Sequence, residues 1–420
     1  MHHFHYQDNV LHCEQVPIPH IAKAVGTPFY LYSHATLERH FRAFDNAFQG
    51  IERLVCYSAK ANTSQAILTL LRQWGSGLDI VSGGELQRGL IAGFAPRSMV
   101  YSGVGKRIDE IDCAISQGIL MFNIESLEEL QLIDVRAGML GLKARVAIRI
   151  NPDVDPQTHP YISTGLKKNK FGIDIATSLE GYDLAQRLKH IQVVGMDCHL
   201  GSQITSVEPF EQALESLKTL LRELNARNIQ IQYLDMGGGL GITYHEESPP
   251  QLSEYAQAIK GALAGTTLKL ILEPGRVIVG NAGILVTQAL YRKEGPDKTF
   301  VIVDAGMNDL MRPTLYGAYH EVQPVVLGQQ ASIVADVVGP ICESGDFLAQ
   351  GRAMATVQRG DLLAVMSAGA YGFAMSSSYC SRPRVAEVMV KGSQFGIIRQ
   401  RETCEDLVRN EQVPEFLTLT

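Results

Sequence analysis

The sequence predicts a (β/α)8 barrel joined to a separate β-rich domain. Eight apolar, strand-like runs each precede a helix-like stretch, and they lie near residues 54–59, 78–82, 98–103, 119–124, 145–151, 192–199, 231–237 and 269–274. Strands that alternate with helices pair in parallel, and eight such units over roughly 250 residues are what a closed barrel requires. The helix expected between the first two strands carries Ala66, Ile67, Leu70 and Leu71 on one face, with Gly75 beyond its end.

The pattern changes after about residue 283, where short β-like runs follow one another with few helices. These runs include residues 284–289, 300–304, 332–338, 361–367 and 384–390. The strand-like Phe29–Tyr32 precedes the first barrel strand, and we expect it to join the β domain. The predicted organisation is therefore an amino-terminal segment, 1–33, that packs with the β domain, a barrel over 34–283 and the β domain over 284–420.

The composition is that of a soluble enzyme with one large or two ordinary domains. The 420 residues are 45% hydrophobic and carry a formal net charge of −7, which suggests no nucleic-acid partner. The longest apolar runs fall short of the roughly 20 residues of a membrane span, and no cationic segment precedes an apolar one at the start. A cytoplasmic location is expected. Seven widely spaced cysteines without a Cys-x-x-Cys pair favour neither disulfides nor zinc, and no metal is predicted.

Polar residues and glycines gather at the carboxyl ends of the predicted barrel strands, where the chemistry of such barrels lies. They are Lys60, Ser82–Glu85, Arg149 with Asn151, His199–Gln203, Asp235–Gly239 and Glu273–Arg276. Packing alone does not explain such a ring of residues at one rim. We therefore expect the functional site there.

Glycines after the last two barrel strands indicate a bound phosphate. Gly237, Gly238 and Gly239 follow the seventh strand and Gly275 follows the eighth, a common position for phosphate in barrels. Without Cβ atoms, their backbone N–H groups can converge on an anion. Either stretch alone is equally well explained as a tight turn, but the two together favour a phosphate site.

Lys60 supplies an amine at the same rim. A lysine at a strand end is usually a solvated surface charge, whereas a partly desolvated one can form a Schiff base with a carbonyl group. Pyridoxal 5′-phosphate needs both an amine and an anion site, so it is the simplest shared ligand. Glu273 would keep its ring nitrogen protonated, unless it forms an ion pair with Arg276. His199 would stack on the ring, unless it is a buried hydrogen-bonding histidine.

Several motifs together resemble the diaminopimelate decarboxylase family, which belongs to the alanine-racemase-like, fold type III pyridoxal-phosphate enzymes. The motifs are Tyr57–Asn62, Asn151–Asp155, Thr158–Tyr161, His199–Gln203, Glu273–Arg276, Met311–Tyr316, Cys342–Asp346 and Gly369–Gly372. The resemblance covers nearly the whole chain, and the set is highly specific.

The resemblance implies a set of cofactor contacts. Lys60 would hold pyridoxal 5′-phosphate as a Schiff base, His199 would stack on its ring and Glu273 would pair with the pyridinium nitrogen. The phosphate contacts would come from the glycine loop Gly237–Gly239, chiefly Gly239, with Gly275, Arg276, Ser202 and the Tyr371 hydroxyl.

The resemblance also implies a substrate and a reaction. Residues similar to the family's substrate contacts are Arg276, Arg312, Tyr316, Glu343 and Tyr371. Arginine forks bind a carboxylate and Glu343 can bind an ammonium, which suits the distal end of a dicarboxylic diamine. The expected reaction is decarboxylation of meso-2,6-diaminopimelate to L-lysine and CO₂, the last step of lysine biosynthesis.

Cys342 is the candidate proton donor. A cysteine is more often a buried apolar residue than a catalyst, but this one precedes Glu343–Asp346, a polar turn whose charges have no packing reason in the sequence. In the family this turn reaches the active site of the neighbouring subunit, so the resemblance implies a homodimer. The chain departs from the family pattern at Ser378 and Cys380, where asparagines are common, and at Val277, where a serine often stands.

Three other functions remain open. A related decarboxylase of ornithine, arginine or lysine would share the cofactor residues but would not need Arg312 and Glu343 for a distal carboxylate and ammonium. A racemase of the same fold would need a proton donor on each face of the substrate. A non-catalytic regulatory homologue would be free to lose Lys60, Glu273 or Cys342, and this chain keeps all three.

Overall fold

The computed structural model describes residues 2–156, 158–159, 161–162, 164–165, 169–328 and 331–417. Pro160, in the motif Thr158–Tyr161, lies outside the described residues. The chain divides into two compact units, one formed by Leu37–Gly280 and the other by Met1–Thr36 with Asn281–Thr420. The domain limits given above from the sequence stay a prediction.

The unit Leu37–Gly280 contains a closed barrel of parallel strands, which confirms the predicted fold class. In order round the ring these strands are β5 (Arg53–Ser58), β6 (Gly77–Ile80), β7 (Met99–Tyr101), β8 (Met121–Ile124), β9 (Ala144–Asn151), β11 (Ile191–Asp197), β12 (Tyr233–Asp235) and β13 (Lys269–Leu272). Pairing of β13 with β5 and of β8 with β9 closes the ring. Each predicted strand-like run overlaps one of these strands. The short β10 (Ile173–Asp174) pairs with β9.

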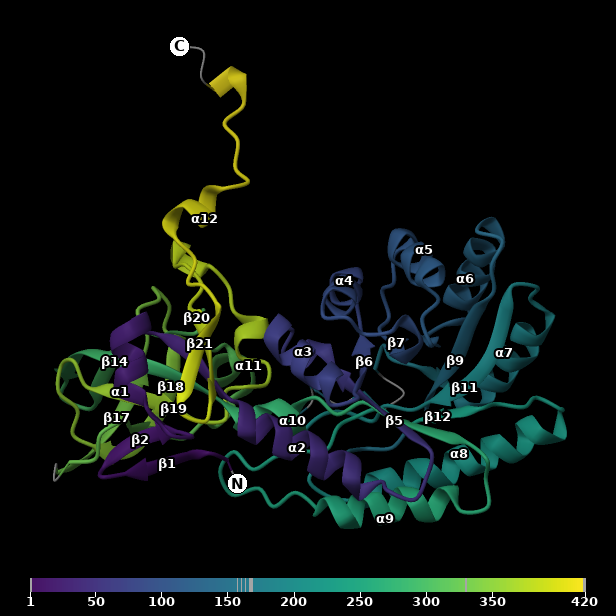
Figure 1. The fold of residues 1–420 in the computed structure, drawn as a ribbon, viewed down its shortest axis with the longest axis horizontal. Helices are drawn as coiled ribbons and strands as arrows, with labels where there is room; N and C mark the ends of the chain where they lie inside the picture. The colour runs from purple at the N-terminus through teal and green to yellow at the C-terminus, as the bar shows by residue number, and fades with distance from the viewer. Residues whose placement is uncertain are drawn as a thin grey trace. The chain divides into compact units, whose positions relative to one another are not determined.

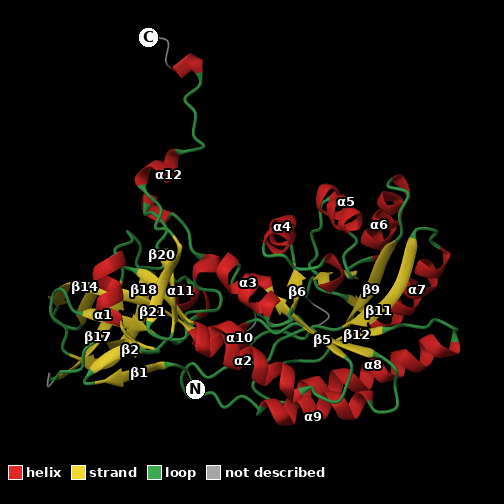
Figure 2. Ribbon diagram, in the orientation of Figure 1, coloured by secondary structure: helices red, strands yellow, loops and turns green. Residues whose placement is uncertain are grey.

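Helices alternate with the barrel strands, as Figure 2 shows in red and yellow. They are α2 (His34–Ala47), α3 (Gln65–Gln73), α4 (Gly83–Ile91), α5 (Ile108–Gln117), α6 (Leu127–Met139), α7 (Ile175–Arg187), α8 (Glu208–Ala226), α9 (Leu252–Leu263) and the short α10 (Arg276–Val279). The long α8 and α9 lie side by side (Figure 1). Within the described ranges, no helix is long and apolar enough to cross a membrane.

The helix α3 follows its predicted apolar face only in part. Ile67 and Leu71 are buried, and so is Leu68, which the prediction left out. Ala66 and Leu70 are only half-buried. The buried face of α3 therefore includes Leu68, while Ala66 and Leu70 lie at its edge. An amphipathic helix buries the stripe that packs against its neighbours. Gly75 beyond the helix has a φ of 93°, which a residue with a side chain rarely adopts.

The barrel interior changes from apolar to polar along the strands. One buried cluster contains Cys56, Val100, Leu120, Met121, Ala147, Val194 and Ile271. Toward the carboxyl ends the strands carry buried polar side chains, which are Asp79, Asn123, Asp197 and Asp235, and Glu273 follows β13. The interior thus offers a packed apolar floor beneath a polar rim.

The unit of Met1–Thr36 and Asn281–Thr420 is β-rich. Its strands are β1 (Phe4–Gln7), β2 (Val10–Cys13), β3 (Val16–Pro17), β4 (Phe29–Ser33), β14 (Gly283–Glu294), β15 (Thr299–Val303), β16 (Val322–Pro324), β17 (Ser332–Val338), β18 (Phe347–Ala355), β19 (Leu362–Val365), β20 (Ala386–Lys391) and β21 (Gln394–Arg399). Its helices are α1 (Ile18–Val25), α11 (Arg312–Tyr316) and α12 (Cys404–Val408). As predicted, Phe29–Tyr32 joins this β structure, because β4 pairs with both β14 and β20.

Candidate active site

Lys60 lies directly after β5, in the 3-10 helix Ala59–Ala61, at the carboxyl end of the barrel. Its Nζ donates a hydrogen bond to Oδ2 of Asp79 at 2.6 Å. The Lys60 side chain is 32% exposed, whereas Asp79 is wholly buried. Lys60 is therefore not a solvated surface charge. Sequence reasoning missed Asp79, although a charged residue inside the apolar strand β6 is unusual and could have drawn attention to it.

Glu273 is buried at the end of β13, with 2% of its side chain exposed. Its Oε1 lies 3.3 Å from Ser102 Oγ and 3.4 Å from Asn123 Nδ2, and both groups can donate to it. Burial, followed by the nearby carboxyl groups of Asp235 and Asp79, raises the pKa of Glu273 well above its usual value. This carboxyl group has a strong tendency to hold a proton.

His199 follows β11, and its ring is held in one tautomer. The Gly238 N–H donates to Nδ1 of His199 at 3.1 Å, so Nδ1 carries a lone pair and the proton of the neutral ring is on Nε2. Burial, with Arg149 and Lys60 nearby, lowers the His199 pKa well below its usual value. The 3.8 Å separation between Nδ1 and Glu273 Oε2 is therefore not an ion pair, because the ring is uncharged.

The glycine loop Gly237–Gly239 lets three strand ends approach one another closely. A Cβ atom on Gly238 would lie 2.2 Å from the Glu273 carbonyl oxygen, and one on Gly237 would lie 2.6 Å from His199 Nδ1. Gly239 has a φ of 113°, and a Cβ there would lie 2.6 Å from the carbonyl oxygen of Gly201. Larger residues would push these strand ends apart.

Two backbone N–H groups of this region are available to an anion. The N–H of Gly237 donates to Asp235 Oδ1 at 2.9 Å, and that of Gly238 is used by His199. Among the described residues, nothing accepts a hydrogen bond from the N–H of Gly239 or of Gly275. A side chain on these glycines would fill the space beside the N–H groups of Gly239 and Gly275. A space with two such donors fits a phosphate group.

Arg276 begins α10 beside these glycines and is buried. Its Nη1 donates to the Tyr244 hydroxyl at 2.7 Å and its Nη2 to Ser202 Oγ at 2.8 Å. Ser202 and Arg276, both predicted from the sequence to contact the phosphate, are therefore in direct contact. Tyr244, which sequence reasoning missed, orients the guanidinium and packs its ring 5.8 Å from it.

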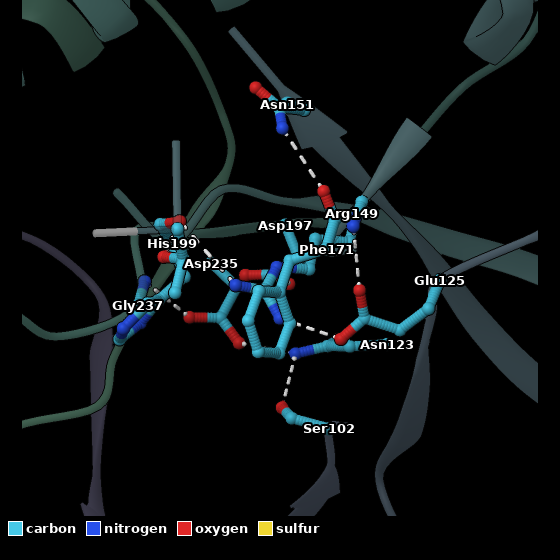
Figure 3. A network of polar contacts seen from close by, with 12 residues as sticks. Ser102, Asn123, Glu125, Arg149, Asn151, Phe171, Asp197, His199, Asp235 and Gly237 are labelled. Carbon is cyan, nitrogen blue, oxygen red and sulfur yellow. Dashed lines mark hydrogen bonds and ion pairs between the residues drawn. The ribbon is translucent and has the colours of Figure 1, made fainter. Parts of the chain in front are cut away.

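Figure 3 shows a polar network between the carboxyl ends of the barrel strands. Arg149 donates to Glu125 Oε1 at 2.6 Å and lies 3.9 Å from Asp197. The Asn123 amide donates to Ser102 at 3.1 Å and to Asp235 at 3.2 Å. Of these residues, Arg149 and Asp235 stood out in the sequence, whereas Ser102, Asn123, Glu125 and Asp197 did not. Among the described residues, no three His, Cys, Asp or Glu side chains are arranged to hold a metal ion.

The β-rich unit carries the other predicted site residues. Arg312 is buried, and its Nη1 lies 2.8 Å from His320 Nε2. His320 Nδ1 lies 2.8 Å from the Met366 carbonyl oxygen, so Nδ1 is the donor and Nε2 accepts from Arg312. Sequence reasoning missed His320. Tyr316 and Tyr371 are half-buried in the same unit.

The turn Cys342–Asp346 contains both exposed and buried residues. Cys342 and Glu343 are exposed. Asp346 is buried and accepts hydrogen bonds from the N–H groups of Met307 and Ile341, each at 2.6 Å. The interpretation that the charges of this turn have no packing reason is wrong for Asp346, because its carboxylate satisfies two buried backbone donors.

One departure from the family pattern lies beside this turn. The Tyr379 hydroxyl hydrogen-bonds with the Glu343 carboxylate, which raises the Tyr379 pKa. Cys380 has a φ of 55°, in the left-handed region where asparagine is favoured among residues with side chains. The segment Ser378–Cys380 therefore positions a tyrosine against Glu343.

Comparisons with known proteins cover nearly all of the chain. A family model described as "Pyridoxal-dependent decarboxylase, pyridoxal binding domain" matches residues 34–280. A diaminopimelate decarboxylase of Pseudomonas aeruginosa is 50% identical over 410 residues, which cover 98% of this chain and 99% of that protein. One of Aquifex aeolicus is 49% identical over 404 residues and covers 96% of each. The crystal structure of diaminopimelate decarboxylase from Helicobacter pylori complexed with L-lysine has a TM-score of 0.91 at 43% identity, covering 94% of this chain and 99% of that one.

Proposed function

The chain belongs to the diaminopimelate decarboxylases, within the pyridoxal-dependent decarboxylases, and from this premise we propose how its residues perform the reaction. It is a carboxy-lyase that uses pyridoxal 5′-phosphate to convert meso-2,6-diaminopimelate to L-lysine and CO₂, the last step of lysine biosynthesis. The related decarboxylases of ornithine, arginine or lysine and the regulatory homologues are less well supported, because relatives of about half-identical sequence carry the diaminopimelate decarboxylase name.

The barrel residues fit the cofactor in type and position. When bound, pyridoxal 5′-phosphate supplies an electron sink for the electron pair left by the departing CO₂. Lys60 would bind its carbonyl carbon. The N–H groups of Gly239, Gly275 and Arg276, with Ser202 and the Tyr371 hydroxyl, would hold the phosphate, and Gly237 and Gly238 would shape the loop through the close approaches described above.

Three barrel side chains would act beside the cofactor site, two of them through a proton. Asp79 Oδ2 lies 2.6 Å from Lys60 Nζ, a distance at which it can take the proton that the amine must lose before it reacts. His199 presents a neutral ring with Nδ1 held by Gly238, so it can lie flat against the cofactor without adding charge. Glu273 would face the ring nitrogen of the bound cofactor and pair with its proton.

Side chains of the β-rich unit, together with Arg276 of the barrel unit, would recognise the substrate. We propose that Arg312 and Arg276 bind carboxylates and that Glu343 binds the distal ammonium group, with Tyr316 and Tyr371 as further contacts. The buried Arg312 is supported by His320, so its guanidinium is fixed in direction. Cys342 is exposed at the tip of a turn anchored by Asp346, and it would donate the proton that replaces CO₂ on the α-carbon.

The protein would act as a homodimer in the cytoplasm. The exposure of Cys342 and Glu343 supports the dimer, because a catalytic thiol and an ammonium-binding carboxylate must be desolvated by a surface that covers them. We propose that the barrel of a second copy is that surface. A cytoplasmic location suits an enzyme whose substrate and product are small metabolites.

One observation carries the proposal most strongly. Lys60, His199, Glu273 and the glycine loop Gly237–Gly239 meet at the carboxyl ends of adjoining strands in one barrel, and the Lys60 amine is hydrogen-bonded to the buried Asp79. No structural need of a barrel demands all of these side chains at one rim.

The test is CO₂ release by purified protein loaded with pyridoxal 5′-phosphate and offered meso-diaminopimelate, L-lysine, L-ornithine and L-arginine in parallel. Release from meso-diaminopimelate alone is expected, because only this substrate has a distal carboxylate for the arginines. Release from another diamine only would support the proposed cofactor chemistry but would show that the substrate is not meso-diaminopimelate. No CO₂ release from any of the four compounds would contradict the decarboxylase function.

A further inference from the structure

Four carboxyl groups lie buried together near the carboxyl ends of the barrel strands. Asp79 is on β6, Asp197 ends β11, Asp235 ends β12 and Glu273 follows β13, and each is at most 2% exposed. Every one of them would lose most of its hydration if it were ionised, and mutual repulsion would add to that cost. The mechanism above uses only Asp79 and Glu273, so the other two need an explanation.

The positive charges nearby do not match this number of carboxylates. Lys60 pairs with Asp79 at 2.6 Å. Arg149 lies 3.9 Å from Asp197, but its shortest contact is with Glu125 at 2.6 Å. Among the described residues, Oδ1 of Asp79 and Oδ1 of Asp197 have no hydrogen-bond partner. Four buried carboxyl groups thus share two cations, which favours a proton on at least one of the four.

Asp235 and Glu273 are the pair best placed to share that proton. These two groups share a hydrogen-bond donor, and a proton on one of them removes the repulsion between two neighbouring buried charges. The Asn123 amide reaches both, at 3.2 Å from Asp235 Oδ2 and 3.4 Å from Glu273 Oε1. The other oxygen of Asp235 accepts from the Gly237 N–H at 2.9 Å. Figure 3 shows the Asn123 amide directed at Asp235 and Asp235 directed at Gly237.

We propose that Asp235 and Glu273 hold one proton between them, and that Asp235 is a positioning residue that sets the protonation of Glu273. The pair then behaves as one acid with a delocalised negative charge. This deepens the proposed function and rests on it in one respect, namely that Glu273 faces the cofactor's ring nitrogen. With the Asp235 carboxyl group next to it, Glu273 would bind the proton that it shares with the ring nitrogen more tightly.

Charged groups from several elements surround the pair and shift the proton they share. Burial first raises the pKa values of Asp235, to about 6, and of Glu273, well above its usual value. The titratable groups that face the pair are Lys60 after β5, Cys56 on β5, Asp79 on β6, Arg149 on β9, Asp197 on β11, His199 after β11 and Tyr255 on α9. Two of them, Lys60 and Arg149, are cations that limit the repulsion between the remaining carboxylates.

The direct test is infrared spectroscopy of the full chain without added cofactor at neutral pH, through the C=O stretching band of protonated carboxyl groups. We would compare the parent protein with Asp235→Asn, Glu273→Gln and the double variant. If one proton is shared, each single change removes the same one-carboxyl band, and the double change removes no more.

The control is Asp174→Asn. Asp174 is exposed and caps α7 through its side chain, and asparagine caps a helix equally well. This variant should keep the whole band. Burial also raises the pKa values of Glu85 and Asp309 to about 7, so their parts of the band are identified with Glu85→Gln and Asp309→Asn. In the parent protein the remaining band of the pair should disappear in a single one-proton step as the pH rises, which tests the proposal even if Asp235→Asn or Glu273→Gln fails to fold.

Three results would overturn the proposal. If the double variant loses as much band intensity as the two single variants together, the two groups hold two separate protons. If only one single variant loses the band, the proton lies on that residue alone. No loss in either would mean that neither group is protonated. A second measurement uses the loaded protein: Asp235→Asn should lower the pH at which the absorbance of the bound cofactor changes, while Asp174→Asn should not. Because the infrared test needs no cofactor or substrate, its failure leaves the proposed function standing.

Discussion

The barrel and the β-rich unit contribute candidate site residues of opposite kinds. The barrel side chains are enclosed, with 16% of His199 and 2% of Glu273 exposed, and each is hydrogen-bonded to residues at the ends of other barrel strands. In the β-rich unit Arg312 is equally enclosed, but Cys342 and Glu343 stand exposed on a turn. Under the proposed function, one chain would preorganise the cofactor half of the site by itself, whereas Cys342 and Glu343 would need a covering surface.

The largest effect should come from the barrel. Lys60→Ala should abolish both turnover and the absorbance of the lysine-bound cofactor, because Lys60 is the amine that we propose binds the cofactor. Absorbance spectra and reduction with borohydride followed by peptide mapping would check this. Lys143→Ala, which removes an exposed lysine, is the matched control. A reducible lysine-bound cofactor that persists in Lys60→Ala would show that another lysine is the anchor.

The exposed turn should affect chemistry without affecting cofactor binding. Cys342→Ala should lower turnover by roughly 10²- to 10⁴-fold, the usual contribution of a general acid, while the cofactor absorbance stays that of the parent protein. Cys404→Ala, another exposed cysteine, on α12, should leave turnover unchanged. Unimpaired turnover in Cys342→Ala would remove this thiol from the mechanism.

The glycine loop tests how tightly the barrel half is packed. Gly238→Ala should destabilise the fold by about 3 kcal/mol, because its Cβ would lie 2.2 Å from a backbone oxygen. Gly261→Ala, inside α9 with no atom within 4 Å of the added Cβ, should instead stabilise by up to about 1 kcal/mol. Urea unfolding measures both. Equal effects of the two changes would contradict the close approach at Gly238.

The smallest predicted effect is a pH dependence at Glu85, beside Lys60. Burial raises its pKa from 4.5 to about 7, partly offset by the hydrogen bond from the Val81 N–H. Between these values the unfolded chain loses this proton first, so the free energy of unfolding falls as the pH rises. Since Glu85 is half-buried, the loss should be about 1 kcal/mol. Glu85→Gln should remove it, and an unchanged difference between urea unfolding at pH 5 and pH 8 would refute the assignment.

The sequence predicted the rim residues better than their partners. Lys60, His199 and Glu273 stand where strand-like runs end, and a barrel brings all strand ends to one rim, so their meeting follows from the fold class. Asp79, Asn123 and Asp197 lie inside strands, where only the register and twist of the sheet decide which side chains meet. The register and twist of the sheet cannot be read from the few residues around each of these positions in the sequence.

The β-rich unit shows the same limit. The sequence did not single out the strand β18 (Phe347–Ala355), because it contains Gln350, Gly351 and Arg352, residues that weaken a strand pattern. Its pairing with β17 overrides that local preference. Likewise, nothing in the sequence joins Arg312 to His320, since their contact depends on how the chain turns after α11.

The central claim is that the exposed turn of one chain completes the barrel site of another. The most direct test mixes two inactive variants, Lys60→Ala and Cys342→Ala, under conditions in which subunits exchange. A mixed dimer then contains one site with both the Lys60 amine and the Cys342 thiol, so a statistical mixture should recover about a quarter of the parent activity. If the mixture stays inactive although exchange is verified, Cys342 serves its own chain and the claim is wrong.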